Sequence, residues 1–444
     1  MTIAPYIQNM PQRPQPAPAI TEIAYLEPAL YAARLRDQQH VLLLESVMRH
    51  EHLGRWSFLA CNPSQTLQGL ESLEVIRNHL ATAPTSMHPG LPPFQGGYAG
   101  YISYDAGWAF QGAQHPPKFK PPCPNIAFNR YDTVVGFDHM QERSFIFGPD
   151  DATLEKLLKR KPTTEGSATI ENWHSNFTKD AYEKAIARTV EYILAGDIFQ
   201  ANITQCFAAD IPSGFDAFAF YQRLRQTNPA PFAAYLDFPS VTIASSSPER
   251  LVKMTGRQLE ARPIKGTRPR LDDVARNAAM IAELQSSRKD RAENVMIVDL
   301  LRNDLSRIAK PGSVTVPVLC GLESYANVHH LVSIVAAEAR DNMNAIDVLQ
   351  AVFPGGSITG APKIRAMEII AEMEQQARGI YCGSIGWMGF NGHADFNIAI
   401  RTAVFAQGKA YVQSGGGITA RSNPTAEYDE SLTKISTIMK AFQS

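Results

Sequence analysis

The sequence predicts an α+β fold in which antiparallel strands pack together with long helices. Short strand-like runs alternate with tight turns such as Thr255-Gly256 and Asn391-Gly392, which is typical of antiparallel hairpins. Residues 287–309 and the residues after Asn423-Pro424 carry helical spacing instead. Hairpins mixed with long helices favour α+β over a parallel doubly wound sheet.

The strands are predicted mainly in the C-terminal half. A first group surrounds the Thr255-Gly256 turn, and a second group forms a three-stranded meander with turns at Asn391-Gly392 and Gln407-Gly408. The first group consists of Val241–Ser246, Leu251–Met254 and Gln258–Pro263, and the meander of Tyr381–Phe390, Ala394–Ala406 and Ala410–Ser414.

The domain organisation is predicted from composition. Residues 1–20 are rich in Pro and Gln and lack a signal-peptide pattern, so a flexible tail is expected. An N-terminal half (21–160) and a C-terminal catalytic half (170–444) follow, joined through the polar stretch Gly148–Ala168. The Pro-rich stretch His115–Pro124 is expected to be a loop.

Composition excludes several classes of function. The 444 residues are 44% hydrophobic, enough for a large core, and 42 basic side chains nearly balance 43 acidic ones. No basic block suggests nucleic acid, and no run of about 18 apolar residues suggests a membrane span. The five cysteines are scattered without a C-x-x-C pair, so we expect no disulfides, no zinc site and a cytoplasmic location.

Lys265 lies among the cations Arg262, Arg268 and Arg270. A lysine is a nucleophile only when neutral, and its ordinary pKa is about 10.4. Burial and nearby positive charge lower that pKa. Lys265 is therefore either a solvated surface charge or an activated amine, and its surroundings in sequence leave both interpretations open.

Two predicted helices each carry acidic residues three apart. Glu293 falls on the apolar face of 287–309, and Asp290 lies about 60° round the same helix. A carboxylate on such a face is costly without a partner. On the second helix Glu427 and Glu430 precede Lys434, a pattern that also fits ordinary surface support. Together the four carboxylates could form an oxygen-rich Mg²⁺ site.

Two glycine-rich runs resemble ligand-binding loops. Gly355–Lys363 is not a P-loop, because Ala361 and Pro362 separate the last glycine from the lysine. It is expected to lead into a helix at Pro362 whose free amides can receive an anion. The run Ser414–Ile418 ends a strand and provides either close backbone approach to a ligand or a flexible bend.

Taken together, these segments resemble the chorismate-utilising enzymes from about residue 21 onward. That resemblance implies a large fold of antiparallel sheets packed together, with helices outside. The phrases that carry it are Gly196–Gln205, Ser247–Arg250, Pro263–Thr267, Asp290–Asn294, Asp299–Asp304, His329–Ser333, Gly355–Lys363 and Gly415–Ile418.

Two positions distinguish the members of this family. Members that add water to chorismate place a lysine base where this chain has Gln200, and members that form anthranilate carry alanine where it has Lys265. The resemblance therefore implies amination at C4, giving 4-amino-4-deoxychorismate for 4-aminobenzoate and folate synthesis. Anthranilate formation is the alternative. A non-catalytic regulatory subunit would be expected to lack the acid, metal and lysine residues.

The resemblance also implies roles for individual residues. Glu293 and Glu430 would hold Mg²⁺ directly, and Asp290 and Glu427 would do so through water. Glu249 would be the general acid and Lys265 the nucleophile that attacks C2. The residues expected to bind or orient the substrate are Gln200, Thr267, His330, Ser357, Tyr381, Arg401, Gly415, Gly416, Gly417 and Lys434.

Three of these roles compete with simpler interpretations. Glu249 could be a turn residue paired with Arg250, and His330 a satisfied core histidine. Arg401 would lie in the middle of a strand, where an unpaired charge is unfavourable.

The resemblance implies two partners besides chorismate. No glutaminase-like segment is found, so ammonia would come from solution or from a glutamine amidotransferase subunit. Leu42–Ser46 resembles a tryptophan pocket of the family, with Glu45 and Ser46 as its expected lining.

Overall fold

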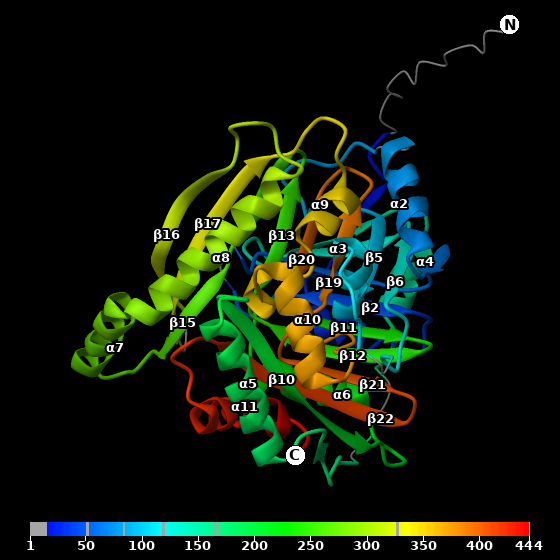
Figure 1. The fold of residues 1–444 in the computed structure, drawn as a ribbon. Helices are drawn as coiled ribbons and strands as arrows, with labels where there is room; N and C mark the ends of the chain where they lie inside the picture. The colour runs from blue at the N-terminus through cyan, green and yellow to red at the C-terminus, as the bar shows by residue number, and fades with distance from the viewer. Residues whose placement is uncertain are drawn as a thin grey trace, which may run out of the picture.

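Two antiparallel sheets form the centre of the protein, and helices lie outside them (Figure 1). The structure is a computed structural model that describes residues 16–49, 53–82, 85–117, 120–162, 166, 168–325 and 328–443. Most of the predicted tail, residues 1–15, lies outside the described residues, and Ile20 already begins the first strand. The predicted α+β class is confirmed.

The larger sheet has twelve strands within the described residues, all paired antiparallel. In spatial order they are β1 (Ile20–Ile23), β8 (Arg143–Phe147), β7 (Val134–Asp138), β3 (Trp56–Ala60), β2 (Val41–Glu45), β11 (Phe232–Phe238), β12 (Val241–Ser247), β21 (Thr402–Ala406), β22 (Lys409–Ile418), β10 (Gln200–Asp210) and β18 (Gly360–Ala361), with β9 (His174–Ser175) also paired to β10.

The smaller sheet has ten strands in the same described ranges. Their spatial order is β15 (Ile264–Pro269), β17 (Val328–Glu338), β14 (Gln258–Ala261), β13 (Arg250–Thr255), β20 (Ala394–Asn397), β19 (Ser384–Gly389), β5 (Gly97–Ile102), β6 (Ile126–Tyr131) and β4 (Gln65–Gln68), with β16 (Thr315–Ser324) also paired to β17.

A continuous apolar cluster joins strands of the two sheets. Phe58 and Leu236 of the larger sheet share it with Tyr101 and Trp387 of the smaller one. Phe58 and Trp387 meet edge to face, with ring centroids 5.5 Å apart. Each buried side chain of this size contributes about 1.5–3 kcal/mol, so this layer holds the sheets together.

The helices cover outer faces and edges of these sheets. α8, α9 and α2 contribute to a cluster with strands of the smaller sheet, and α1, α4, α6 and α11 to one with the larger sheet, while α5 and α10 pack on β10 (Figure 1). None of the helices in the described part of the chain is long and apolar enough to span a bilayer. Their bounds are α1 Pro28–Ala32, α2 Glu71–Thr82, α3 Gly107–Gln111, α4 Asp151–Leu158, α5 Lys179–Leu194, α6 Ala217–Thr227, α7 Val274–Ser286, α8 Arg288–Ser306, α9 Ala345–Val352, α10 Lys363–Glu374 and α11 Pro424–Lys440, with 3₁₀ turns η1 Tyr104–Ala106 and η2 Gly356–Ile358.

The two helices predicted to carry acidic pairs begin at clear capping residues. The side chain of Ser287 accepts a hydrogen bond from the Asp290 amide at the start of α8. Asn423 does the same for the Ala426 amide, and Pro424 occupies the first turn of α11. Both predicted helices are confirmed.

Both sheets draw strands from both halves of the sequence. β2 of the N-terminal half pairs with β11 of the C-terminal half, and β5 pairs with β19. The stretch 148–168 contains α4, which packs beside β1 and β8. The predicted boundary near residues 160–170 therefore divides the sequence into two halves, but these halves do not correspond to the two sheets.

The predicted three-stranded meander is wrong in its middle strand. Residues 394–406 form two strands, β20 in the smaller sheet and β21 in the larger one. The chain crosses between the sheets at 398–401, where Arg401 has a positive φ of 53°. Arg401 therefore does not lie mid-strand, and the crossing directs its side chain elsewhere.

Candidate active site

Lys265 lies within β15 and is half-buried, so the surface-charge interpretation is wrong. Its Nζ donates to the backbone carbonyl of Ser357, 3.3 Å away. Burial lowers the pKa of Lys265, and the charge of Lys434 lowers it further, whereas Glu293 and Glu249 oppose that shift. The amine form of Lys265 is therefore more accessible than that of an exposed lysine.

Glu249 lies between β12 and β13, directly before Arg250, and is only 6% exposed. Burial raises its pKa, although Ser357 and Lys265 offset part of the effect. Arg250 does not pair with it: the Arg250 guanidinium binds both oxygens of Asp395 at 2.9 Å and Glu260 at 3.2 Å. Glu249 is therefore a buried acid close to Lys265, and the simpler interpretation of a turn residue paired with Arg250 is wrong.

α8 places Glu293 beside this pair of groups. Oε1 of Glu293 is buried without a hydrogen-bond partner among the described residues, and Lys289 Nζ lies 3.9 Å from it. Burial raises the pKa of Glu293, and the charges of Asp290 and Glu427 add to the rise. Asp290 itself receives a 3.4 Å bond from Arg268.

Lys289 and Arg268 were missed from the sequence. Lys289 lies four residues before Glu293, so the spacing rule for helical ion pairs would have found it. Arg268 comes from β15, and its contact with Asp290 depends on the tertiary fold.

α11 brings the second acidic pair to the same region. Lys434 Nζ lies 2.6 Å from Glu430 Oε1, so the expected surface pair does form. Glu427 is buried, which raises its pKa, and the charge of Glu430 adds to that effect. Burial also raises the pKa of Glu430, but the charge and hydrogen bond of Lys434 outweigh burial, so the pKa of Glu430 is lowered overall.

The three glycines of 415–417 lie inside β22, in regular register with β10, so the bend interpretation is wrong. A Cβ on Gly416 would lie 3.1 Å from Glu427 Oε2, 3.5 Å from Lys434 Nζ and 3.7 Å from Glu430 Oε1. The Gly415 carbonyl accepts a 2.9 Å bond from Lys434. Glycine at 416 thus leaves room beside the carboxylates.

Gln200 faces the next glycine. A Cβ on Gly417 would lie 2.5 Å from Gln200 Nε2. Gln200 is 1% exposed, and neither atom of its amide has a hydrogen-bond partner in the described ranges. A buried unpaired amide is unfavourable, so this group is available for a ligand.

The carboxylates fit a divalent cation in chemistry, but they are not arranged around one. Within the described residues, no group of three or more His, Cys, Asp or Glu side chains is placed to hold a metal. Three observations favour a cation: the orphaned Glu293 Oε1, the space beside Gly416, and the mutual repulsion that helps to raise the pKa of Glu293 and Glu427.

Arg401 reaches this region from the crossing between the sheets. Its guanidinium donates to the backbone carbonyl of Lys434. Burial lowers the pKa of Arg401, while Tyr381 and Glu430 oppose that shift. Tyr381 is buried, which raises the pKa of its hydroxyl.

Thr267 and His330 form the outer part of the site. The Thr267 hydroxyl is 2.9 Å from Nδ1 of His330. His330 is half-buried, and burial lowers its pKa. The fully satisfied core histidine is its neighbour His329, which bonds Ser324 at 2.7 Å and Asn277 at 2.9 Å. The satisfied core histidine is therefore His329 and not His330.

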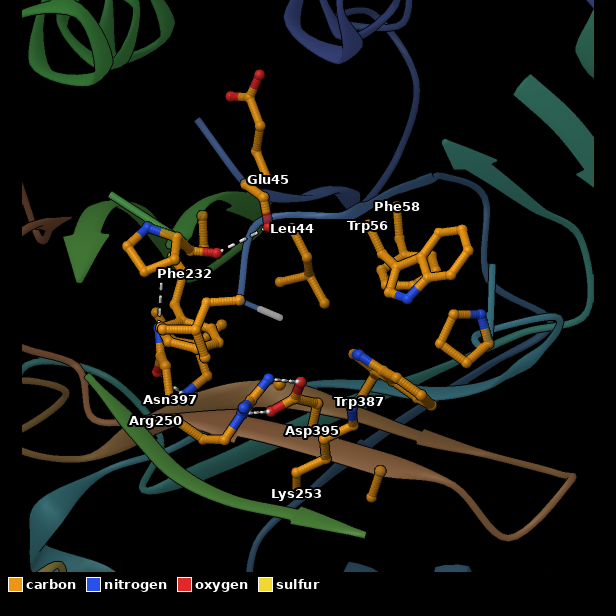
Figure 2. A pocket seen from close by; sticks show the side chains of 18 of the residues that line it. Leu44, Glu45, Trp56, Phe58, Phe232, Arg250, Lys253, Trp387, Asp395 and Asn397 are labelled. Carbon is orange, nitrogen blue, oxygen red and sulfur yellow. Dashed lines mark hydrogen bonds and ion pairs between the residues drawn. The ribbon is translucent and has the colours of Figure 1, made fainter. Parts of the chain in front are cut away.

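Glu45 and Ser46 line a separate cavity of about 260 Å³ between the sheets. Figure 2 shows Trp56, Phe58 and Trp387 at this cavity, with the Arg250–Asp395 pair at its floor. The Glu45 side chain points away from it and binds Arg225, at 2.6 and 2.9 Å (Figure 2). Glu45 therefore presents its backbone to the cavity.

Comparison with known proteins identifies the family. The family described as "chorismate binding enzyme" matches residues 28–440 of this chain. Because this covers most of the chain, the protein belongs to the family of chorismate binding enzymes.

Two types of relative match at similar identity. Aminodeoxychorismate synthase component 1 of Salmonella typhimurium is 36% identical, over 100% of this chain and 99% of its own length. Anthranilate synthase component 1 of Streptomyces coelicolor is 38% identical, over 90% of this chain and 83% of its own length. The solved anthranilate synthase component I of Streptococcus pneumoniae superposes with a TM-score of 0.77 at 29% identity, covering 88% of this chain and 94% of that one. Overall identity does not separate the two types.

We predict that Glu249→Gln stabilises the protein increasingly as pH rises. Burial raises the folded-state pKa of Glu249, so the folded state holds this proton more tightly than the unfolded state. Stability is then lost as pH rises from the unfolded pKa, about 4.3, through the folded one. Neutral Gln avoids that loss, so its advantage in unfolding free energy should grow as pH rises from the unfolded pKa through the raised folded pKa of Glu249.

Urea unfolding at several pH values measures this difference. Glu191→Gln, at an exposed position of α5, is the control for removing one charge. A difference between Glu249→Gln and the unsubstituted protein that does not change with pH would contradict the prediction.

Proposed function

We propose that this chain converts chorismate and ammonia to 4-amino-4-deoxychorismate, as component I of an aminodeoxychorismate synthase. The observation that carries the proposal is Lys265, half-buried near Glu249 and bonded to the Ser357 carbonyl. Anthranilate formation is the alternative, and it needs no amine at this position. A purely regulatory chain has no use for a half-buried lysine, a buried acid and two acidic helices at one place.

Chorismate is a dianion, and the region contains matching groups. Arg401 and Lys434 supply positive charge, and the absence of side chains at Gly416 and Gly417 leaves the strand backbone close to Glu427, Lys434 and Gln200. Tyr381, Thr267 and His330 border the proposed ring position. The unpaired Gln200 amide offers a donor and an acceptor, but it is too weak a base to activate water.

Glu293 and Glu430 would hold Mg²⁺, with Asp290 and Glu427 supporting it through water. When bound, the ion supplies positive charge that fixes a substrate carboxylate. The side chains must first move together, because they do not converge in this structure. Lys289 and Lys434, which now neutralise Glu293 and Glu430, would release them.

The chemistry proceeds in two displacements. Neutral Lys265 attacks C2 of chorismate, the ring double bond shifts, and the C4 hydroxyl leaves as water after receiving the proton of Glu249. Ammonia then adds at C4, the double bond shifts back, the lysine is expelled as an amine, and the extra proton of the new ammonium group returns to the Glu249 carboxylate. The sum is chorismate plus ammonia giving 4-amino-4-deoxychorismate plus water, and the enolpyruvyl group is retained.

Ammonia would be supplied by a separate glutamine amidotransferase subunit. The relatives named aminodeoxychorismate synthase component 1 support this proposal, because the name implies a further component. We place the chain in the cytoplasm, which the five free cysteines support. Its product would serve 4-aminobenzoate and folate synthesis.

Product identity is the experiment that tests the proposed function. With chorismate, Mg²⁺ and an ammonium salt at alkaline pH, we expect mass spectrometry to find 4-amino-4-deoxychorismate. Glutamine should replace ammonium only after an amidotransferase subunit is added, and excess chelator should abolish turnover. Anthranilate and pyruvate as products would establish the alternative, and full turnover in chelator would remove the metal from the proposal.

We predict that Lys265→Ala slows 4-amino-4-deoxychorismate formation by about a hundredfold or more in kcat, because the two-step displacement is lost. Direct addition of ammonia at C2 then becomes the accessible route, so anthranilate-type product should increase. Trapping chorismate on the unsubstituted protein should label the Lys265 peptide. A variant with a raised KM, an unchanged kcat and no labelled peptide would show that Lys265 only binds the dianion.

We also propose that tryptophan occupies the cavity beside Ser46. Its volume of about 260 Å³ and the rings of Trp56, Phe58 and Trp387 suit an indole side chain. Calorimetric titration with tryptophan should show binding, and Trp387→Ala should weaken it by about tenfold or more. No heat of binding in protein shown to be free of copurified tryptophan would contradict this proposal.

A further inference from the structure

The Gly355–Lys363 run has a lysine that no step of the reaction uses. Lys363 Nζ donates to Asp304 Oδ2 at 2.7 Å and to the Val352 carbonyl at 3.0 Å. The side chains of Lys363 and Asp304 are only 6% and 4% exposed. Val352 ends α9 before the run, Lys363 is the last residue of the run and the first of α10, and Asp304 belongs to α8. One ammonium group therefore ties together both ends of the run and the helix that carries Glu293.

The run between these ends holds the reacting lysine. The carbonyl of Ser357 accepts the bond from Lys265 Nζ. A Cβ on Gly356 would lie 2.6 Å from Leu300 of α8, so the run is packed directly against that helix. On its other side the Thr359 carbonyl accepts a 2.7 Å bond from the Asn202 amide, next to Gln200 and Gly417.

The position of the Ser357 carbonyl thus depends on where α8 and the two ends of the run lie. A shift of the run away from α8 would move this carbonyl and with it the Lys265 amine. Errors of about 1 Å in the placement of a reacting group can cost about a hundredfold in rate.

We propose that Lys363 and Asp304 form a positioning pair that sets the place of Lys265 through the Gly355–Pro362 run, without touching the substrate. This inference rests on the proposed function, since it assigns Lys265 as the reacting group. It predicts an effect on kcat rather than on the KM for chorismate, because no substrate-binding group is displaced.

Buried ion pairs offer a way to separate positioning from stability. Removing one partner leaves an uncompensated buried charge, whereas replacing both with apolar residues of similar shape is often tolerated. Leucine has the branched shape of aspartate, and methionine keeps the long stem of lysine. The double variant Lys363→Met/Asp304→Leu should therefore recover the stability that each single variant loses.

The experiment compares Lys363→Met, Asp304→Asn and Lys363→Met/Asp304→Leu with the unsubstituted chain. We expect Tm to fall in Lys363→Met and to recover for the most part in the double variant. In Lys363→Met and in the double variant, the kcat for ammonium-dependent turnover should stay at least about 30-fold below that of the unsubstituted chain. The KM for chorismate should stay within about threefold of the unsubstituted value. Arg36→Met, which breaks the 2.6 Å Arg36–Asp216 pair far from the site in sequence, is the matched control and should lower Tm only.

Recovery of kcat together with Tm in the double variant would show a merely structural pair and overturn the proposal. Unchanged kcat in the single variants would do the same. If the single variants do not fold, the double variant decides alone.

A second readout does not depend on turnover. The rate at which acetic anhydride acetylates Lys265, followed by mass spectrometry, should change by about threefold or more in the double variant and stay constant in Arg36→Met. An unchanged rate overturns the positioning role. Absence of product with the unsubstituted chain, together with a changed acetylation rate, would refute the proposed function and leave the positioning inference standing.

Discussion

The site depends on the place where the chain twice crosses from one sheet to the other. Residues 247–250 lead from β12 into β13, and residues 398–401 lead from β20 into β21. Backbone groups at such a buried crossing need partners, and the two crossings bond to one another. The Ser247 hydroxyl donates to the Ile398 carbonyl at 2.6 Å, the Ile398 amide to the Glu249 carbonyl at 2.9 Å, and the Ser246 amide to the Arg401 carbonyl at 3.0 Å. These bonds fix the backbone that carries Glu249 and Arg401.

The same crossings give the site its unusual charges. At this seam Glu249 is buried and Arg401 is half-buried, and burial disfavours the charged form of each. The charges around them are of both signs: Lys265 lies near Glu249, and Glu430 near Arg401. The site therefore places an acid with a raised pKa close to an amine with a lowered pKa, and both shifts have burial as their main cause.

Sequence reasoning located the groups of the site better than the path that brings them together. The helices with acidic pairs could be predicted because caps at Ser287 and Asn423 and the apolar stripe are local signals. The break in 394–406 could not, because both pieces have strand composition and only the tertiary fold assigns them to different sheets. The direction of the Glu45 side chain depends in the same way on Arg225, which lies 180 residues away.

Lys363 illustrates the same limit. Its spacing from the glycines excludes a P-loop, yet nothing local reveals that its partner is Asp304, 59 residues earlier. Contacts of this kind depend on which helices are neighbours, and periodicity does not carry that information.

The strand order has a consequence for the order of folding. β21 and β22, near the end of the chain, lie between β12 and β10, and β19 and β20 lie between β13 and β5. Neither sheet is complete until these late segments have been synthesised. During translation the earlier strands keep unpaired edges and exposed apolar faces. Both features slow folding and promote aggregation. A chain truncated before residue 394 lacks β20 of the smaller sheet and β21 and β22 of the larger one, so the catalytic seam and the completed core form together at the end of synthesis.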